Sequence, residues 1–100
     1  MNFQELEVME LSHFIWSELE ILELKSPVPV YPKCDVAAVD VMYCCHEIAE
    51  HLQRTVARAD RDWLDILYIT CANVACTIHA FMCRENRLPT WDDLGDWHNG

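Results

Sequence analysis

Glycine is nearly absent from this chain, and that scarcity limits the available folds more than any other feature. The 100 residues contain two glycines, Gly95 and Gly100, both at the C-terminal end. Hairpin turns need residues with positive φ, which glycine adopts at the least cost. A hairpin-rich β fold is therefore excluded, and one mainly helical domain is expected from a chain of this length.

Apolar residues recur at helical spacing along three long segments. In the first segment the apolar stripe is Val8, Leu11, Ile15, Leu19 and Leu22. We predict an all-α fold, a three-helix bundle with a short C-terminal fourth helix, over about residues 2–25, 36–59, 61–85 and 91–94. Residues 26–35 contain three prolines and form an extended connector inside this single domain, residues 1–100.

The third predicted helix is apolar nearly all round. Residues 66–83 are 18 positions without Asp, Glu, Lys or Arg. This length reaches the short end of the roughly 17–25 residues that a membrane span needs. The flanking charges are mixed in sign at both ends and show no positive-inside bias. We therefore expect a buried central helix rather than a membrane segment.

The chain is strongly acidic. It has 7 Lys and Arg against 17 Asp and Glu, which gives a formal net charge of −10. Nucleic acid and anionic membrane surfaces are excluded as direct partners, because both are bound through clustered basic residues. The apolar fraction of 52% also excludes a disordered acidic tail.

A second stripe runs along the first predicted helix, apart from its core stripe. It consists of Glu5, Met9, Trp16, Glu20 and Glu23. Met and Trp set among carboxylates are typical of a partner-binding face. In one alternative Trp16 folds back on the connector or the tail, and in another the stripe is a homodimer seam. We add Asp40 and Glu47, from the polar face of the second helix, to the predicted partner-binding residues.

The six cysteines favour a reduced, cytoplasmic protein. Five of them fall within apolar helical pattern, where thiols behave as small buried hydrophobes. The N-terminus lacks the basic region of a signal peptide. We expect no metal, although Cys76, His79 and Cys83 share one helix face and are a weaker alternative as zinc ligands.

Two carboxylate pairs raise an enzymatic alternative. The pairs are Glu47 with Glu50 and Asp62 with Asp65, each at i,i+3 spacing. On adjacent antiparallel helices such pairs can bind Mg²⁺. The pattern over residues 45–75 resembles the ExxE and ExxD motifs of MazG-type all-α nucleoside triphosphate pyrophosphohydrolases, which implies a Mg²⁺-dependent pyrophosphohydrolase. It departs from that family at Asp62, where Glu is usual, and at His46, where the family has an acidic residue.

Apart from this pattern, the sequence contains neither a nucleophile elbow nor a phosphate-binding glycine loop, so we predict a protein that is not an enzyme. Its size, acidity and single helical domain resemble, as a type, the phage-encoded anti-CRISPR proteins. The resemblance implies no cofactor, a location in the host cytoplasm and binding to a basic surface of a CRISPR surveillance complex. It also implies that this binding blocks recognition of target DNA. The remaining alternative is an acidic structural protein or homodimer with no catalytic role, whose charge only keeps it in solution.

Overall fold

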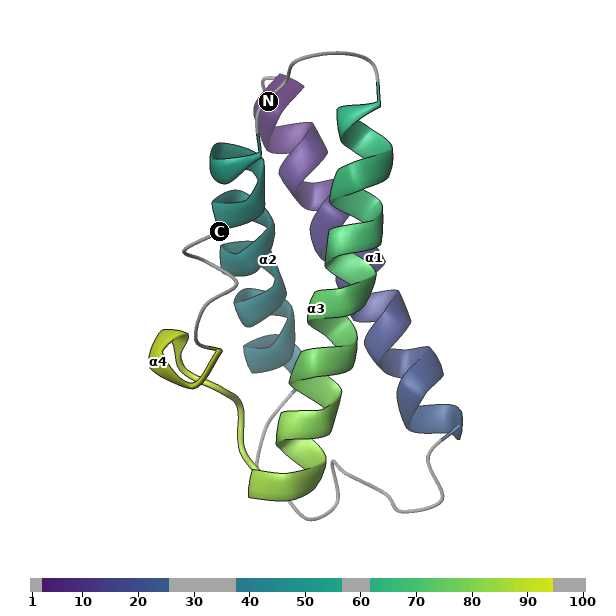
Figure 1. Ribbon diagram of the computed structural model, residues 1–100, viewed down its shortest axis with the longest axis vertical. Coiled ribbons are helices and arrows are strands. Elements are labelled where there is room, and N and C mark those ends of the chain that lie inside the picture. Colours follow the sequence, from purple (N-terminus) through teal and green to yellow (C-terminus); the bar gives the residue numbers. More distant parts are fainter. Residues whose placement is uncertain (1–2, 26–37, 57–61, 95–100) are drawn as a thin grey trace.

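The described residues fold mainly into helices. A computed structural model describes residues 3–25, 38–56 and 62–94, and contains no strand within them (Figure 1). The helices are α1 (Phe3–Lys25), α2 (Ala38–Thr55), α3 (Trp63–Glu85) and α4 (Trp91–Leu94). The predicted all-α bundle with a short fourth helix is confirmed. The connector at 26–35 and the predicted helix ends at 2, 36–37, 57–59 and 61 lie outside the described residues.

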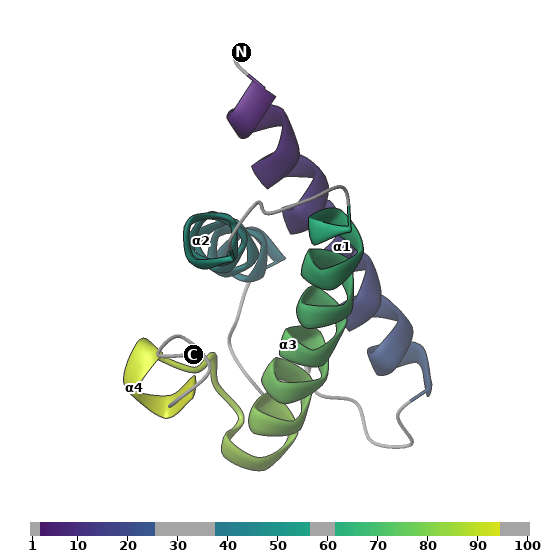
Figure 2. The same cartoon turned by 45° about the horizontal axis from the view of Figure 1, so that its top comes forward.

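Helix α1 lies at the centre of the bundle. It packs along both α2 and α3, whereas α2 and α3 meet each other at few points. Helices α1 and α3 run in the same direction and α2 runs the opposite way (Figure 1), with α2 and α3 on separate sides of α1 (Figure 2). The prediction that the third helix is central is therefore wrong. Two neighbours bury a wider arc of α1 than the single apolar stripe indicated.

The core follows the predicted stripe of α1. Leu11, Ile15 and Leu19 are fully buried, Val8 nearly so, and Leu22 is partly buried against them. Their partners from α2 and α3 include Ile48, Leu52, Leu67, Cys71 and Ile78. Between α1 and α3, the rings of Phe14 and Tyr68 pack edge to face with centroids 4.8 Å apart. Each fully buried Leu or Ile contributes about 1.5–3 kcal/mol by its removal from water.

Only one side of α3 is buried. Its outer side exposes Ile66 and Ile69, with 52% and 64% of their surface accessible. The hydroxyls of Thr70 and Thr77 donate to backbone carbonyls one turn earlier, at 2.7 and 3.0 Å, so they present mainly methyl groups outward. By length and composition α3 is the one helix among the described residues that could cross a membrane. Within the fold, 39% of its apolar 18-residue stretch is buried.

The chain after α3 is fixed by local hydrogen bonds. Asn86 takes the left-handed conformation, with φ of 61°, and its N–H donates to the Met82 carbonyl. A reciprocal capping box then starts α4, because Thr90 donates its backbone N–H to Asp93 at 2.8 Å and accepts from the Asp93 N–H at 3.3 Å. Arg87 also donates to Asp93, at 2.9 and 3.3 Å, and lies over the ring of Phe81.

The cysteines divide into buried and exposed sets. The five that the structure describes are free thiols. Cys45 and Cys71 are fully buried, as predicted, and burial raises the pKa of both to about 12. Cys76 and Cys83 are exposed, which corrects the expectation that they are buried. They lie on the outer side of α3, the side that a central helix would have covered.

Candidate interaction surfaces

The second stripe predicted along α1 is exposed at some of its residues and partly buried at others. Glu5, Met9 and Glu20 are exposed. Trp16 is partly buried and packs against the core, so it offers a partner less surface than the sequence indicated. The core covers a wider arc of α1 than expected because helices pack on two of its sides.

Glu23 belongs to the margin of this stripe rather than to its centre. Its side chain is partly buried near the end of α1. Burial raises the pKa of Glu23, and His79 on α3 opposes that rise. Glu23 therefore lies toward α3, and its carboxylate is less available to a partner than those of Glu5 and Glu20.

The outward side of α1 carries apolar residues that the stripe did not include. Leu6, Ile21 and Leu24 are 47%, 43% and 86% exposed. We define the acidic–apolar face of α1 as its exposed Glu, Leu, Ile and Met side chains: Glu5, Leu6, Met9, Glu10, Glu20, Ile21 and Leu24. The leucines and isoleucine were missed because helical spacing alone did not separate the outward apolar residues from those that two neighbours bury.

The negative charge of this face reaches the adjoining surface of α3. A shallow groove of about 460 Å³ lies between them, lined by Leu6, Met9, Glu10, Phe14 and Tyr68 among others. Burial and then the charge of Glu10 raise the pKa of Tyr68. The groove therefore combines apolar walls with the carboxylate of Glu10, and His13 lines it as well.

A second groove separates α1 from α2. It has a volume of about 510 Å³, and its walls include Glu5, Met9, His46, Glu50 and Arg54. Across one turn of α2, Glu50 contacts Nε2 of His46 at 3.5 Å. His46 Nδ1 lies 3.4 Å from the hydroxyl of Ser12. Sequence reasoning missed this contact because Ser12 and His46 lie on different helices.

The Ser12–His46–Glu50 series is structural rather than nucleophilic. Ser12 is 3% exposed, and its hydroxyl donates to the Val8 carbonyl at 2.7 Å. A nucleophilic serine has to reach substrate and pass its proton to the histidine. Beside it, the buried carboxylate of Glu7 accepts a 2.8 Å hydrogen bond from Gln53. These polar contacts fix the register of α1 against α2.

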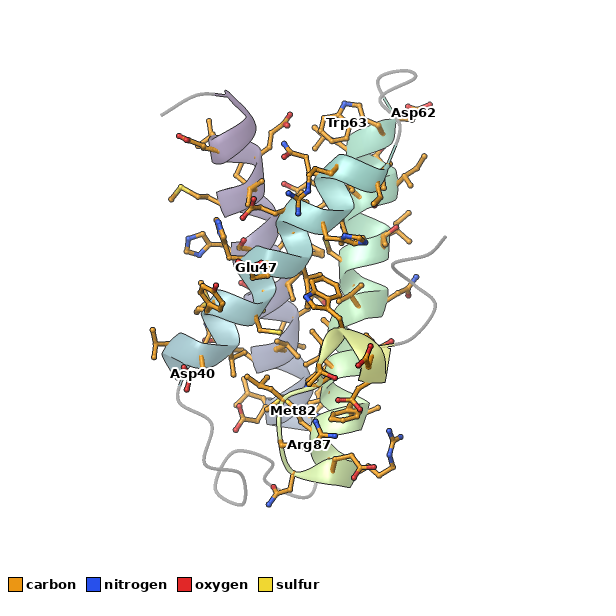
Figure 3. The ribbon with its side chains drawn as sticks, turned by 90° about the vertical axis from the view of Figure 1, so that its left-hand side faces the viewer. Asp40, Glu47, Asp62, Trp63, Met82 and Arg87 are labelled. Carbon is orange, nitrogen blue, oxygen red and sulfur yellow. The ribbon has the colours of Figure 1, made fainter. Side chains whose placement is uncertain are left out.

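Both predicted partner-binding carboxylates of α2 line a pocket. Asp40 and Glu47 face a cavity of about 290 Å³ between α2 and the segment that carries α4 (Figure 3). Tyr43 and Trp91 also line it, and they are 67% and 40% exposed. The sequence supplied the two carboxylates, but it could not show that α4 folds back beside them.

The four carboxylates of the enzymatic alternative do not converge. Glu47 lines the α2–α4 pocket, whereas Glu50 lines the α1–α2 groove. Asp62 precedes the first turn of α3, well away from Glu47 along the bundle (Figure 3), and Asp65 follows it as an exposed residue. Within the described ranges, no group of three or more His, Cys, Asp or Glu is placed to hold a metal ion. The Mg²⁺ site that the MazG resemblance implies is therefore not assembled by these residues in this structure.

The alternative zinc ligands are also separated. Cys83 lies 3.8 Å from the nearer ring nitrogen of His79, on the surface of α3. Cys76 is exposed and adds no third donor to a metal-binding group in the described part of the chain. Cys83 and His79 are therefore an exposed thiol and an imidazole one helical turn apart.

Comparison with known proteins adds no family to this description. No family model, curated protein or solved structure matches the chain.

Proposed function

We propose that this chain is a small acidic interaction protein that binds a basic protein surface in a nucleic-acid-handling complex and blocks recognition of target DNA. A CRISPR surveillance complex is the partner implied by the resemblance to anti-CRISPR proteins. The acidic–apolar face of α1 carries the proposal. Exposed Leu6, Ile21 and Leu24 lie there beside exposed glutamates, on a helix with six Glu and no Lys or Arg between residues 5 and 23.

Charge and apolar surface have separate roles in this binding. A net charge of −10 on 100 residues steers the chain toward a basic surface and speeds their encounter. Charge alone gives little affinity, because exposed ion pairs are worth only about 0–1 kcal/mol each. The exposed apolar side chains supply burial at the centre of the contact, and the glutamates around them pair with Lys and Arg at its rim.

Direct block of DNA recognition follows from competition for the same cations. A nucleic-acid channel holds phosphates with clustered Lys and Arg. A helix that offers carboxylates to those groups occupies the site without binding nucleic acid itself. The protein acts in the host-cell cytoplasm, has no catalytic role in this proposal and needs no cofactor.

The test compares two charge-reversed variants with the same net charge. The first changes Glu5, Glu10 and Glu20 to Lys, all on the acidic–apolar face. The control changes Asp65, Glu85 and Asp92 to Lys, which are exposed outside that face. The tagged proteins capture partners from a lysate of the cell in which the chain occurs, and mass spectrometry identifies what is retained.

We expect the parent and the control to retain one basic nucleoprotein complex and the α1 variant to lose it. Circular dichroism shows whether each variant keeps its helix content. Retention of the same complex by a folded α1 variant contradicts the proposal, and so does equal loss with both variants.

A further inference from the structure

The pocket between α2 and α4 has walls suited to a single cationic side chain. Asp40, Tyr43 and Glu47 are spaced i, i+3 and i+7, so they project from one face of α2. Trp91 closes the opposite side, and buried Ile48 and Leu94 form the apolar base. Figure 3 shows Asp40 at the start of α2 and Glu47 further along the same helix.

The charge in this pocket is unbalanced. Among the lining residues that the structure describes there is no Lys, Arg or His. Within residues 3–25, 38–56 and 62–94, neither Asp40 nor Glu47 forms a hydrogen bond or ion pair with a side chain. Burial, followed by the charge of Glu47, raises the pKa of the Cys44 thiol beside it. The pocket therefore favours a positively charged ligand.

The wall formed by α4 is held in place by bonds that leave the pocket carboxylates available. Asp93 is occupied by Arg87 and Thr90, and Arg87 rests on Phe81 at 4.8 Å from the ring centroid. Trp91 packs against the ring of His51, with centroids 5.1 Å apart. A preformed wall lowers the ordering cost of binding.

We propose that this pocket binds the guanidinium group of an arginine side chain on the partner. This proposal rests on the proposed function, because it assigns one contact within the basic surface. A volume of about 290 Å³ is at the low end for ligand pockets, which fits one side chain rather than a nucleotide. A guanidinium is planar and weakly hydrated, so its faces lie against aromatic and apolar walls while its edges donate to carboxylates. An ammonium group makes poorer use of such walls.

The test titrates isotope-labelled protein with N-acetyl-arginine amide at low salt and follows amide and indole N–H signals by NMR. The Trp91 indole signal is assigned by its loss in Trp91→Phe. The corresponding lysine amide and the neutral citrulline amide are the comparison ligands. We expect saturable shifts confined to residues 38–48 and 88–94, at least threefold weaker binding of the lysine ligand, and no shifts with citrulline.

A charge-matched pair of variants tests the carboxylates. Asp40→Asn with Glu47→Gln should weaken arginine binding at least tenfold. The control, Asp65→Asn with Glu85→Gln, should leave it within twofold. Shifts spread over the whole surface, or equal weakening in both variants, would overturn the arginine site. An unchanged amide spectrum outside the pocket confirms that each variant is folded.

The pocket and the proposed function can fail separately. If arginine amide binds here but the α1 charge reversal does not affect partner retention, the function on the acidic–apolar face fails and the pocket stands. If the α1 reversal abolishes retention and arginine amide does not shift the pocket signals, only the arginine site fails.

Discussion

Truncation of Ile15 to alanine tests which side of α1 faces the core. Ile15 is fully buried, and Ile15→Ala removes three carbon groups from the core. The lost transfer free energy is about 2.4 kcal/mol at about 0.8 kcal/mol per buried group. The residual cavity adds to this, so the expected loss lies within about 2–5 kcal/mol. The total free energy of unfolding of a native domain is only about 5–15 kcal/mol, so this loss is a large part of it.

Ile21→Ala is the matched control on the same helix. Ile21 is 43% exposed, so its truncation removes much less buried area and should cost less than about 1 kcal/mol. Both changes replace isoleucine with alanine in a helix, so the small gain in helix propensity cancels between them. The difference between the variants therefore reports burial alone.

Urea unfolding followed by circular dichroism measures both variants, with thermal melting as a second measure. At about 4–8 °C per kcal/mol, Ile15→Ala should lower Tm by about 10 °C or more. Equal losses for the two variants would refute this orientation of α1. A larger loss of unfolding free energy for Ile21→Ala would mean that the side of α1 carrying Ile21 faces the core.

Three further measurements test other parts of the structure. Alkylation of the native protein mapped by mass spectrometry should label two cysteines quickly and two only after unfolding, namely Cys76 and Cys83 against Cys45 and Cys71. Arg87 and then Thr90 hold the pKa of Asp93 well below its usual range, so its contribution to stability is present above the unfolded pKa and is lost as pH falls through the folded value. Carboxyl NMR titration should therefore find Asp93 still ionised at a pH where an ordinary aspartate (pKa about 3.9) is mostly protonated. In Arg87→Gln the pKa of Asp93 should rise, while the hydrogen bonds from Thr90 still hold it below the ordinary value. Capture of the partner should weaken with added salt, because a steered contact is screened, and salt-independent capture would indicate a mainly apolar interface.

The individual helices were predictable from local sequence. The stripe from Val8 to Leu22 predicted the core side of α1. The capping box of α4 joins Thr90 and Asp93, which are only three positions apart. Asn86 ends α3 because it tolerates positive φ. These features depend on residues three or four positions apart, which sequence spacing describes directly.

The order of the helices in the bundle was not predictable in the same way. Absence of charge made the third helix look central, yet its outer side, with Ile66 and Ile69, is exposed. Helix α1 is central although it carries six glutamates, because five of them are exposed or only partly buried. The sixth, Glu7, is buried and accepts a hydrogen bond from Gln53. Such a contact joins residues far apart in the chain, and no periodicity reports it.

In the candidate sites, too, local features were predictable from the sequence and contacts between distant segments were not. Sequence reasoning identified Asp40 and Glu47 correctly as residues on one polar face of α2. It could not place Trp91 opposite them, since that depends on the return of the chain after Asn86. It also placed Trp16 outward, because a helical wheel does not show how far a neighbouring helix extends.

In the proposed function, the acidic–apolar face of α1 competes with DNA for a basic surface. The direct measurement uses the purified complex that the parent protein retains, loaded with fluorescent target DNA, and follows DNA anisotropy as the protein is added. We expect complete displacement by the parent and by the Asp65, Glu85 and Asp92 control, with little displacement by the Glu5, Glu10 and Glu20 variant. Binding of the parent that leaves the DNA in place, or equal displacement by both variants, would contradict it.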